Sequence, residues 1–362
     1  MGVPLFDTRT ALEPLRPEID AAVARVLDSG AFILGPETEA FEAEFAHYVG
    51  TDEAIGVANG TEALTIALRA LGVGPGDEVV VPSFTFFASA EAIPPTGATP
   101  VFCDIDPATF CVTSETVKAA MTAKTKAVIA VHLFGNVAPV QEIEALGVPV
   151  IEDAAQSAGS EGRWGRPGSL ATLATFSFYP SKNLGGFGDG GAITTSDPAL
   201  ARRVRSLRFH GSEDRVTHED VGYNSRLDEL QAAILRVQLP HLDGWAARRF
   251  EAGEWYAELL ADDVAHPVPA EGARPAWHIY VVRHKRADEL IAVLNQKGIG
   301  ARAYYRVPSH AQPAFGLELE LPATEVAARE HVALPVSATI TREQVEEVAG
   351  AVRDAGLGSG AS

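Results

Sequence analysis

Short runs of apolar and β-branched residues alternate with helix-period segments through the first two thirds of the chain, and this alternation limits the fold more than any other feature. Strands that alternate with helices form a mostly parallel sheet with helices on its faces. We therefore predict an α/β fold. The runs that favour strands span 54–58, 78–81, 99–102, 127–131, 148–151, 173–178 and 192–195.

Apolar residues at spacings of three and four predict helices at 19–27 and 63–71. A long helical stretch from 227 to about 260, with Pro240 as its kink, would link two parts of the molecule. We predict a large domain of residues 1–245, which includes the N-terminal helical segment, and a smaller C-terminal α+β domain of residues 246–362. The remaining predicted elements are a strand at 277–283 and helices at 287–297, 324–332 and 341–352.

Charge and composition exclude several classes of protein. The chain has 29 basic and 48 acidic residues, and a net charge of -19 repels a phosphate backbone, so we expect no nucleic-acid partner. The first residues lack the basic and apolar regions of a signal peptide. The longest apolar stretch, 127–140, is interrupted and shorter than the roughly 20 residues of a spanning helix. Cys103 and Cys111 share no CxxC spacing. We expect a cytoplasmic protein without a membrane partner or a metal.

One lysine stands in an unusual setting. Lys182 follows an apolar strand and precedes a turn with five glycines, whereas the other lysines have charged or polar neighbours. A buried ammonium is costly unless it is paired or neutral. Covalent attachment to an aldehyde cofactor removes that cost, because the free amine is replaced. The alternative is a lysine that reaches solvent from a flexible loop.

The glycines after Lys182 allow a second interpretation. Gly186, Gly188 and Gly191 match GxGxxG, the fingerprint of a dinucleotide-binding turn. That fingerprint follows a strand and opens a helix, whereas residues 192–195 favour a strand. We therefore reject dinucleotide binding.

A carboxylate is expected at the end of a central strand. Asp153 closes the run 148–153, and ligands of open α/β sheets bind at the carboxyl ends of strands. A carboxylate is what pyridoxal phosphate needs at its pyridine nitrogen, because a protonated ring is an electron sink. The alternative is that Asp153 caps a following helix. Gln156 could donate a hydrogen bond to the ring hydroxyl, although a surface position is the ordinary interpretation of a lone Gln.

A phosphate cradle is predicted where Asn59-Gly60-Thr61 joins a strand to a helix. Amides at a helix start point at an anion with a favourable dipole behind them. Ser177, five residues before Lys182, could add a hydroxyl. The run Phe84-Thr85-Phe86-Phe87 follows the strand that ends at Pro82, and an aromatic residue there could stack on a flat ring. Taken singly, these residues also fit an ordinary turn and an ordinary aromatic core.

Taken together, these motifs resemble the DegT/StrS family of pyridoxal-phosphate-dependent nucleotide-sugar aminotransferases. The likeness runs from about Pro4 into the final helix, and the lysine block is its most specific part. It implies the aspartate-aminotransferase-like type I fold and a homodimer with shared active sites. The motifs are Asn59-Gly60-Thr61, Glu152-Asp153-Ala154-Ala155-Gln156, Phe176 to Asn183, Gly188-Asp189-Gly190-Gly191 and Asn224-Ser225-Arg226-Leu227.

The resemblance also implies a role for each matching residue. Lys182 would carry pyridoxal 5'-phosphate as a Schiff base, and Asp153 would contact the pyridine nitrogen. The other implied cofactor contacts are Gln156 at the ring hydroxyl, Phe86 stacked on the ring, Gly60, Thr61 and Ser177 at the phosphate, and Asn224 reaching the phosphate from the partner subunit. His310 and Tyr304 lie in segments that approach the substrate in the family, although His310 also fits a surface loop.

The resemblance predicts amino transfer from L-glutamate to a nucleotide-linked keto-sugar. A sister branch of the family has histidine in place of the lysine and removes a hydroxyl, so Lys182 favours transamination. The sequence at 222–245, 277–278 and 304–315 most resembles that of family members that aminate C3 of a dTDP-3-keto-6-deoxyhexose. The alternatives are 4-amination of an NDP-4-keto-6-deoxyhexose, 3-amination of a UDP-3-keto sugar acid, and a non-catalytic regulator that only binds the cofactor.

Overall fold

A computed structural model of the protein describes residues 2–358. A seven-stranded sheet forms its centre, in the order β1-β7-β6-β5-β4-β2-β3. The five strands β6, β5, β4, β2 and β3 run parallel to one another, and β7 runs antiparallel to both β6 and β1. The prediction of an α/β fold with a mostly parallel sheet is confirmed. The strands are β1 (Glu53–Val57), β2 (Glu78–Pro82), β3 (Thr99–Cys103), β4 (Thr125–Val131), β5 (Val150–Asp153), β6 (Leu173–Ser177) and β7 (Gly191–Thr195).

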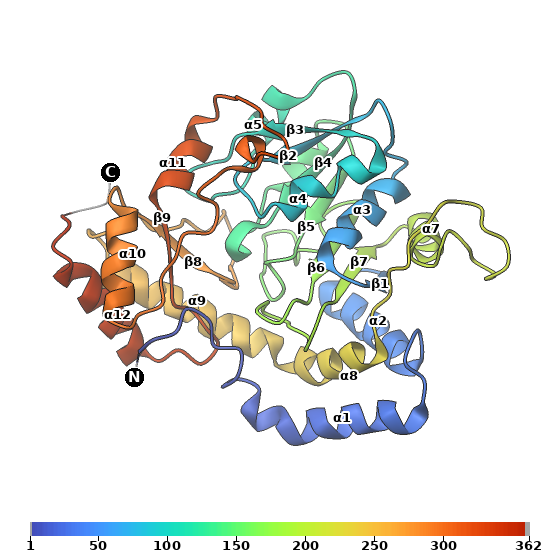
Figure 1. Ribbon diagram of the computed structural model, residues 1–362, viewed down its shortest axis with the longest axis horizontal. Helices are drawn as coiled ribbons and strands as arrows, with labels where there is room; N and C mark the ends of the chain where they lie inside the picture. Colours follow the sequence, from blue (N-terminus) through green and yellow to red (C-terminus); the bar gives the residue numbers. More distant parts are fainter. Residues whose placement is uncertain (1, 359–362) are drawn as a thin grey trace.

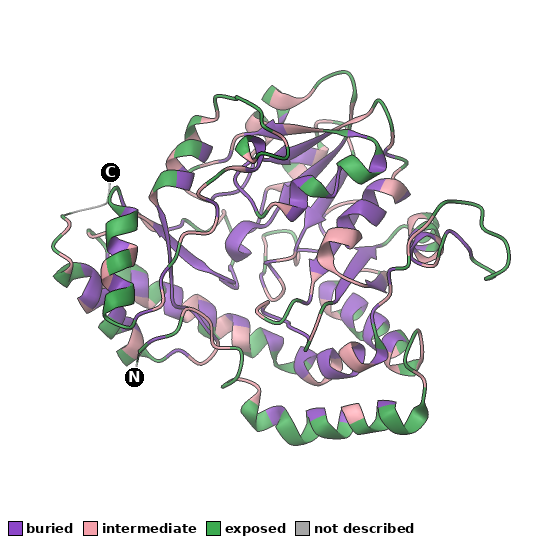
Figure 2. Cartoon of the chain, in the orientation of Figure 1, coloured by how far each residue is buried: buried purple, intermediate pink, exposed green. Residues whose placement is uncertain are grey.

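Both faces of the sheet are covered, as a parallel sheet requires. Side chains alternate between the faces along a strand, so Val79 and Val81 pack with α3 whereas Val80 packs in a second cluster with α5 and α6. Figure 2 shows the sheet buried and α1 exposed along much of its length. The helices around this sheet are α1 (Arg16–Ser29), α2 (Pro36–Val49), α3 (Gly60–Ala70), α4 (Ala88–Glu91), α5 (Ser114–Ala120), α6 (Val140–Glu144), α7 (Pro198–Arg208) and α8 (Glu229–Gln238).

A smaller antiparallel sheet of β8 (Tyr280–Arg283) and β9 (His331–Leu334) lies in the C-terminal part. It packs with α9 (Leu242–Leu259), α10 (Ala287–Gln296) and α12 (Arg342–Asp354) around its own core. Helix α9 contributes Leu242 to a core cluster of the large sheet and Tyr256 to this second core. The predicted domain boundary after residue 245 therefore falls within α9, and the division stays a prediction.

Two C-terminal predictions need correction. The helix predicted at 324–332 is α11 (Pro322–Glu330), and the chain then enters β9 at His331. The strand predicted at 277–283 begins only at Tyr280, because Trp277 has a φ of 29°, outside the extended region. Both errors concern β8 and β9, which pair across about fifty residues and give little local signal.

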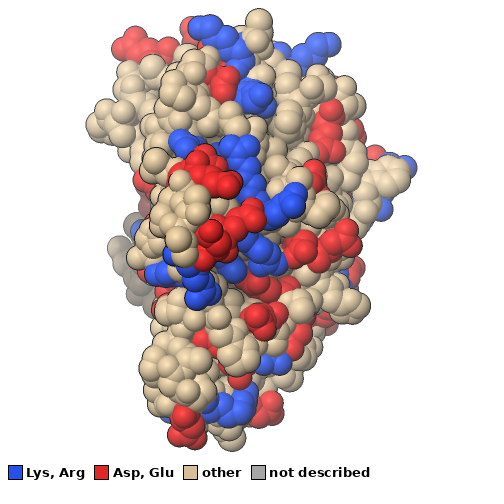
Figure 3. All heavy atoms as spheres, turned by 90° about the vertical axis from the view of Figure 1, so that its right-hand side faces the viewer, with Lys and Arg blue, Asp and Glu red and all other residues tan. Residues whose placement is uncertain are grey.

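The surface carries mixed charge. On the face in Figure 3, acidic and basic side chains lie interspersed and form no continuous basic patch. Cys103 and Cys111 are both buried and free. Among residues 2–358, no helix is long and apolar enough to cross a bilayer. The same residues contain no group of three or more His, Cys, Asp or Glu side chains that could hold a metal ion.

Candidate active site

Asp153 ends β5 at the carboxyl edge of the sheet and is 5% exposed. Its Oδ2 accepts a hydrogen bond of 2.7 Å from the Ser89 hydroxyl, and its Oδ1 accepts one of 3.2 Å from the amide of Ala155. The alternative that Asp153 caps a helix is wrong, because β6 is the next regular element after β5. A buried carboxylate at this edge suits a cationic group on a ligand.

Lys182 lies in the loop between β6 and β7, within electrostatic reach of Asp153. Burial lowers the pKa of the Lys182 amine to about 8, and the negative charge of Asp153 limits that fall. Lys182 also lines a pocket with Phe6, Trp245 and Arg249. The glycines after Lys182 lead into strand β7 and not into a helix, which agrees with the rejection of a dinucleotide-binding turn. An amine with this pKa is partly uncharged near neutral pH, which suits a nucleophile or a base.

The lowered pKa of Lys182 predicts a distinct pH profile for its chemical labelling. In the cofactor-free protein, reaction with an amine reagent should have its midpoint near pH 8, because the uncharged amine is the reactive form. The amine of a lysine model peptide should respond at roughly 10.4, its ordinary pKa. Mass spectrometry of the labelled Lys182 peptide and of the model peptide would measure both midpoints. Asp153→Asn should lower the Lys182 midpoint further, and a Lys182 midpoint equal to that of the model peptide would contradict the prediction.

The start of α3 packs directly against the end of β6. The Asn59 side chain accepts a 2.9 Å hydrogen bond from the Glu62 amide and so caps α3, which begins at Gly60. A Cβ on Gly60 would lie 2.8 Å from the Cβ of Ser177, so only glycine fits without movement. The structure thus brings Gly60, Thr61 and Ser177 together. The first amides of a helix lack carbonyl partners within it and can hold an anion.

Two aromatic residues after β2 have different surroundings. Phe84 is fully buried and packs edge-on against Phe134 and Tyr305. Phe86 is 57% exposed, so the alternative that it belongs to the core is wrong. An exposed aromatic on the segment that carries Ser89 suits contact with a flat ligand.

Gln156 is buried, contrary to the ordinary interpretation of a lone Gln as a surface residue. Its Oε1 accepts a 2.8 Å hydrogen bond from the amide of Phe134, and its Nε2 donates one of 3.1 Å to the Tyr305 hydroxyl. One N–H of the amide is left for another acceptor. Burial raises the pKa of Tyr305, which keeps its phenol neutral.

His310 is also buried, so its alternative as a surface-loop residue is wrong. Its Nδ1 lies 2.6 Å from the hydroxyl of Ser83, the residue that follows β2. Tyr304 is half-buried, and its ring meets that of Phe6 edge-on at 6.4 Å. Segments from the C-terminal part therefore reach the same region as the strand ends.

Residues 209–224 form the loop that projects after α7 in Figure 1, and the backbone of Asn224 closes it by a bridge to Phe209. Its side chain is exposed and accepts a hydrogen bond from Arg226. Its hydrogen-bond partner Arg226 and its bridge partner Phe209 both lie outside the group of Gly60, Thr61 and Ser177.

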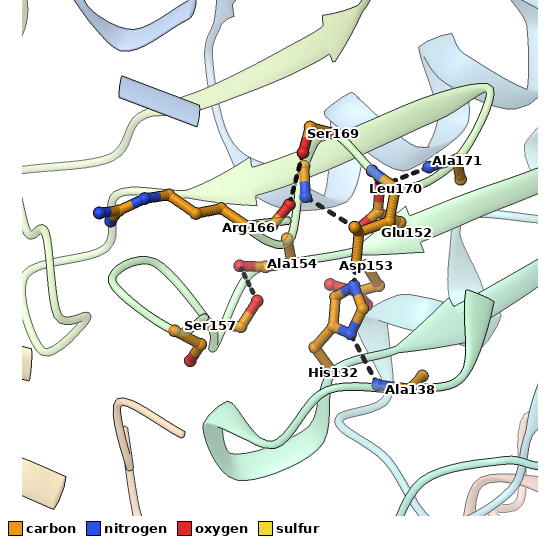
Figure 4. A network of polar contacts seen from close by, with 12 residues as sticks. His132, Ala138, Glu152, Asp153, Ala154, Ser157, Arg166, Ser169, Leu170 and Ala171 are labelled. Atoms are coloured by element: carbon orange, nitrogen blue, oxygen red, sulfur yellow. Dashed lines mark hydrogen bonds and ion pairs between the residues drawn. The ribbon is translucent and has the colours of Figure 1, made fainter. Parts of the chain in front are cut away.

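A buried network of hydrogen bonds around Glu152 anchors the end of β5 (Figure 4). The Nδ1 atom of His132 accepts a hydrogen bond from the backbone amide of Ala138. The ring proton is therefore on Nε2, which donates a hydrogen bond of 2.8 Å to the Glu152 carboxylate. The Glu152 carboxylate also accepts hydrogen bonds from three backbone amides of the segment 168–171. This network fixes the strand that presents Asp153.

The sequence prediction did not identify several residues of this region. Ser89 and Tyr305 bond to predicted site residues, and His278 is buried near Lys182. Burial lowers the pKa of His278, and the positive charges of Lys182 and Arg249 lower it further. The only signals available were a hydroxyl two residues after Phe87 and a Trp-His pair in an apolar run.

Comparison with known proteins identifies this arrangement. The family model of the DegT/DnrJ/EryC1/StrS aminotransferases matches residues 14–353. The chain belongs to this family. A "dTDP-3-amino-3,4,6-trideoxy-alpha-D-glucose transaminase" of Streptomyces venezuelae is 47% identical over 97% of this chain and 96% of its own length. An Acidithiobacillus ferrooxidans relative named as a UDP-N-acetyl-3-dehydro-alpha-D-glucosamine 3-aminotransferase is 42% identical over 97% of each chain.

Solved structures agree with the family model. The crystal structure of S. venezuelae DesV, described as a complex with a ketimine intermediate, has 46% identity and a TM-score of 0.95, with 98% of both chains covered. The predicted type I fold is confirmed. As a DegT/DnrJ/EryC1/StrS aminotransferase, the protein is a pyridoxal-phosphate-dependent sugar aminotransferase, as the sequence resemblance implied.

Proposed function

We propose that the protein transfers the amino group of L-glutamate to C3 of a dTDP-3-keto-6-deoxyhexose. The observation that carries the proposal is the placement of Lys182 in the loop after β6, within electrostatic reach of the buried carboxylate of Asp153 at the end of β5. A pyridoxal-phosphate site needs this pair, a reactive amine for the aldehyde and a carboxylate for the ring nitrogen. The name of the S. venezuelae relative favours C3 and a dTDP sugar.

The residues at the sheet edge fit the cofactor. Lys182 would hold it covalently through Nζ, and Asp153 would pair with its ring nitrogen. The remaining N–H of Gln156 would meet the ring hydroxyl, and exposed Phe86 would cover the ring. The amides of Gly60 and Thr61, with the Ser177 hydroxyl, would hold the phosphate.

Pyridoxal phosphate supplies an electron sink for the negative charge that develops at the substrate carbon. The side chains of this protein would transfer the proton between the reacting carbons. Lys182 Nζ, partly uncharged near neutral pH, would take a proton from the donor carbon and return one to the sugar carbon. Asp153 would keep the ring nitrogen protonated throughout. His310 and Tyr304, from the C-terminal part, would orient the sugar nucleotide.

We propose further that the protein acts as a cytoplasmic homodimer. Asn224 is exposed, and its backbone pairs with that of Phe209, directly after α7. As the family resemblance implies, its side chain would complete the phosphate cradle of a second copy. The division into domains 1–245 and 246–362 belongs to the same proposal.

A substrate panel tests the proposed reaction. The pyridoxamine-loaded protein would be incubated with dTDP-3-keto, NDP-4-keto and UDP-3-keto sugars, and each product would be identified by mass and NMR. We expect an amine at C3 of the dTDP sugar. An amine at C4, or on the UDP sugar acid, would favour the corresponding alternative. In a separate assay on the pyridoxal-phosphate-loaded protein, an absorbance band that does not change when glutamate is added would indicate the non-catalytic regulator.

A further inference from the structure

The Asp153 carboxylate accepts a hydrogen bond from a serine of α4, a short helix distant in the chain. Ser89 lies in α4, after β2, and its Oγ donates to the Asp153 Oδ2 at 2.7 Å. Ser89 is 1% exposed, so water does not compete for this contact. Strands β2 and β5 are separated by β4, and the bond joins residues 64 positions apart.

A second hydroxyl stands behind the first. The Thr85 Oγ1 lies 3.1 Å from the Ser89 Oγ, and Thr85 is also buried. A serine hydroxyl has one proton, and that proton points at Asp153. Thr85 is therefore the donor of the second contact, and the two bonds run in one direction, from Thr85 through Ser89 to Asp153. Hydrogen bonds in such a chain strengthen one another.

We infer that Ser89 is a positioning residue that fixes the Asp153 carboxylate toward the cofactor ring nitrogen and stabilises its negative charge. The inference rests on the role proposed for Asp153. A hydroxyl that donates to a carboxylate forms a charge-assisted bond, which is stronger than a neutral one. The same segment carries Phe86. One short stretch after β2 would therefore supply both the aromatic side chain that covers the face of the cofactor ring and the serine that positions Asp153 at the ring nitrogen.

The test compares Ser89→Ala, Ser89→Cys, Ser89→Thr and Thr85→Val, each loaded with pyridoxal phosphate that carries ¹⁵N in its ring. NMR would follow protonation of the ring nitrogen against pH, and dialysis would give the dissociation constant of the cofactor. Losing a bond to a charged group should weaken binding about tenfold to a hundredfold in Ser89→Ala. The ring nitrogen should also lose its proton at a lower pH.

The other variants separate the hydroxyl from its volume. Ser89→Cys keeps the size of the side chain but donates only weakly, so it should behave like Ser89→Ala even if alanine impairs folding. Ser89→Thr keeps the hydroxyl and should restore both readouts. Thr85→Val should shift them in the same direction by less. Ser157→Ala is the matched control, since Ser157 is equally buried but donates to the Ala154 carbonyl, and should change neither readout.

Two failures can be told apart. If wild-type protein binds a cofactor with a protonated ring nitrogen, and Ser89→Ala and Ser89→Cys match it in both readouts, the role of Ser89 is refuted and the proposed function stands. If the wild-type protein does not bind the cofactor, or binds it with an unprotonated ring, the role of Asp153 and the proposed function are refuted.

Discussion

Lys182→Ala should reduce transamination by about 10²–10⁴-fold, the range of a lost general acid–base. Two losses combine in this variant, because the same nitrogen would hold the cofactor and move the proton. Single-turnover absorbance with glutamate would measure the first half-reaction, and mass analysis of the sugar product would measure the second. Borohydride should fix the cofactor on the Lys182 peptide of the wild-type protein only.

Two controls make the lysine result specific. Lys285→Ala removes an exposed lysine and should leave both half-reactions unchanged. A small primary amine in the buffer should restore part of the activity of Lys182→Ala, since it can move the proton in the vacated space. A Lys182→Ala protein with near wild-type turnover would end the proposed mechanism.

Asp153→Asn should lower kcat by about 10²–10³-fold, as expected when one electrostatic stabiliser of the transition state is removed. The amide has the same shape and its oxygen can still accept from Ser89, but its NH2 cannot accept from the Ala155 amide, so the change removes the charge and one hydrogen bond of 3.2 Å. Stopped-flow measurement of each half-reaction, on protein with known cofactor content, would separate slower chemistry from lost binding.

The control for this variant is Asp28→Asn, which removes the same charge from an exposed position on α1. It should have wild-type kinetics. Asp153→Asn with more than about a tenth of the wild-type kcat would show that the carboxylate does not act as proposed, since the expected range begins tenfold lower.

The central sheet was predictable from sequence because its signals are local. Each predicted strand lies within two residues of an observed one, and Asp153 and Lys182 could be placed because they follow apolar runs. The kink at Pro240 was also visible, and a short 3₁₀ turn at Leu239–His241 joins α8 to α9 there.

Contacts between distant segments were not predictable. The β8 and β9 pairing, the Ser89 bond to Asp153 and the Tyr305 bond to Gln156 each join residues far apart in the chain. The local sequence does not indicate whether a serine or tyrosine side chain faces solvent or a buried polar partner. The family resemblance supplied roles for Gln156 and His310, but neither their burial nor their partners could be obtained from the local pattern.

The bond between Gln156 and Tyr305 has a consequence for dissecting the protein. A fragment that stops near residue 245 would retain the lysine, the carboxylate and the start of α3, yet it would lack the phenol that orients the amide. Phe84 would also lose the Tyr305 ring, one of the aromatic rings against which it packs. No minimal catalytic core can therefore be cut from the N-terminal part, and any swap of C-terminal segments between relatives would exchange part of the cofactor's surroundings along with the sugar-binding surface.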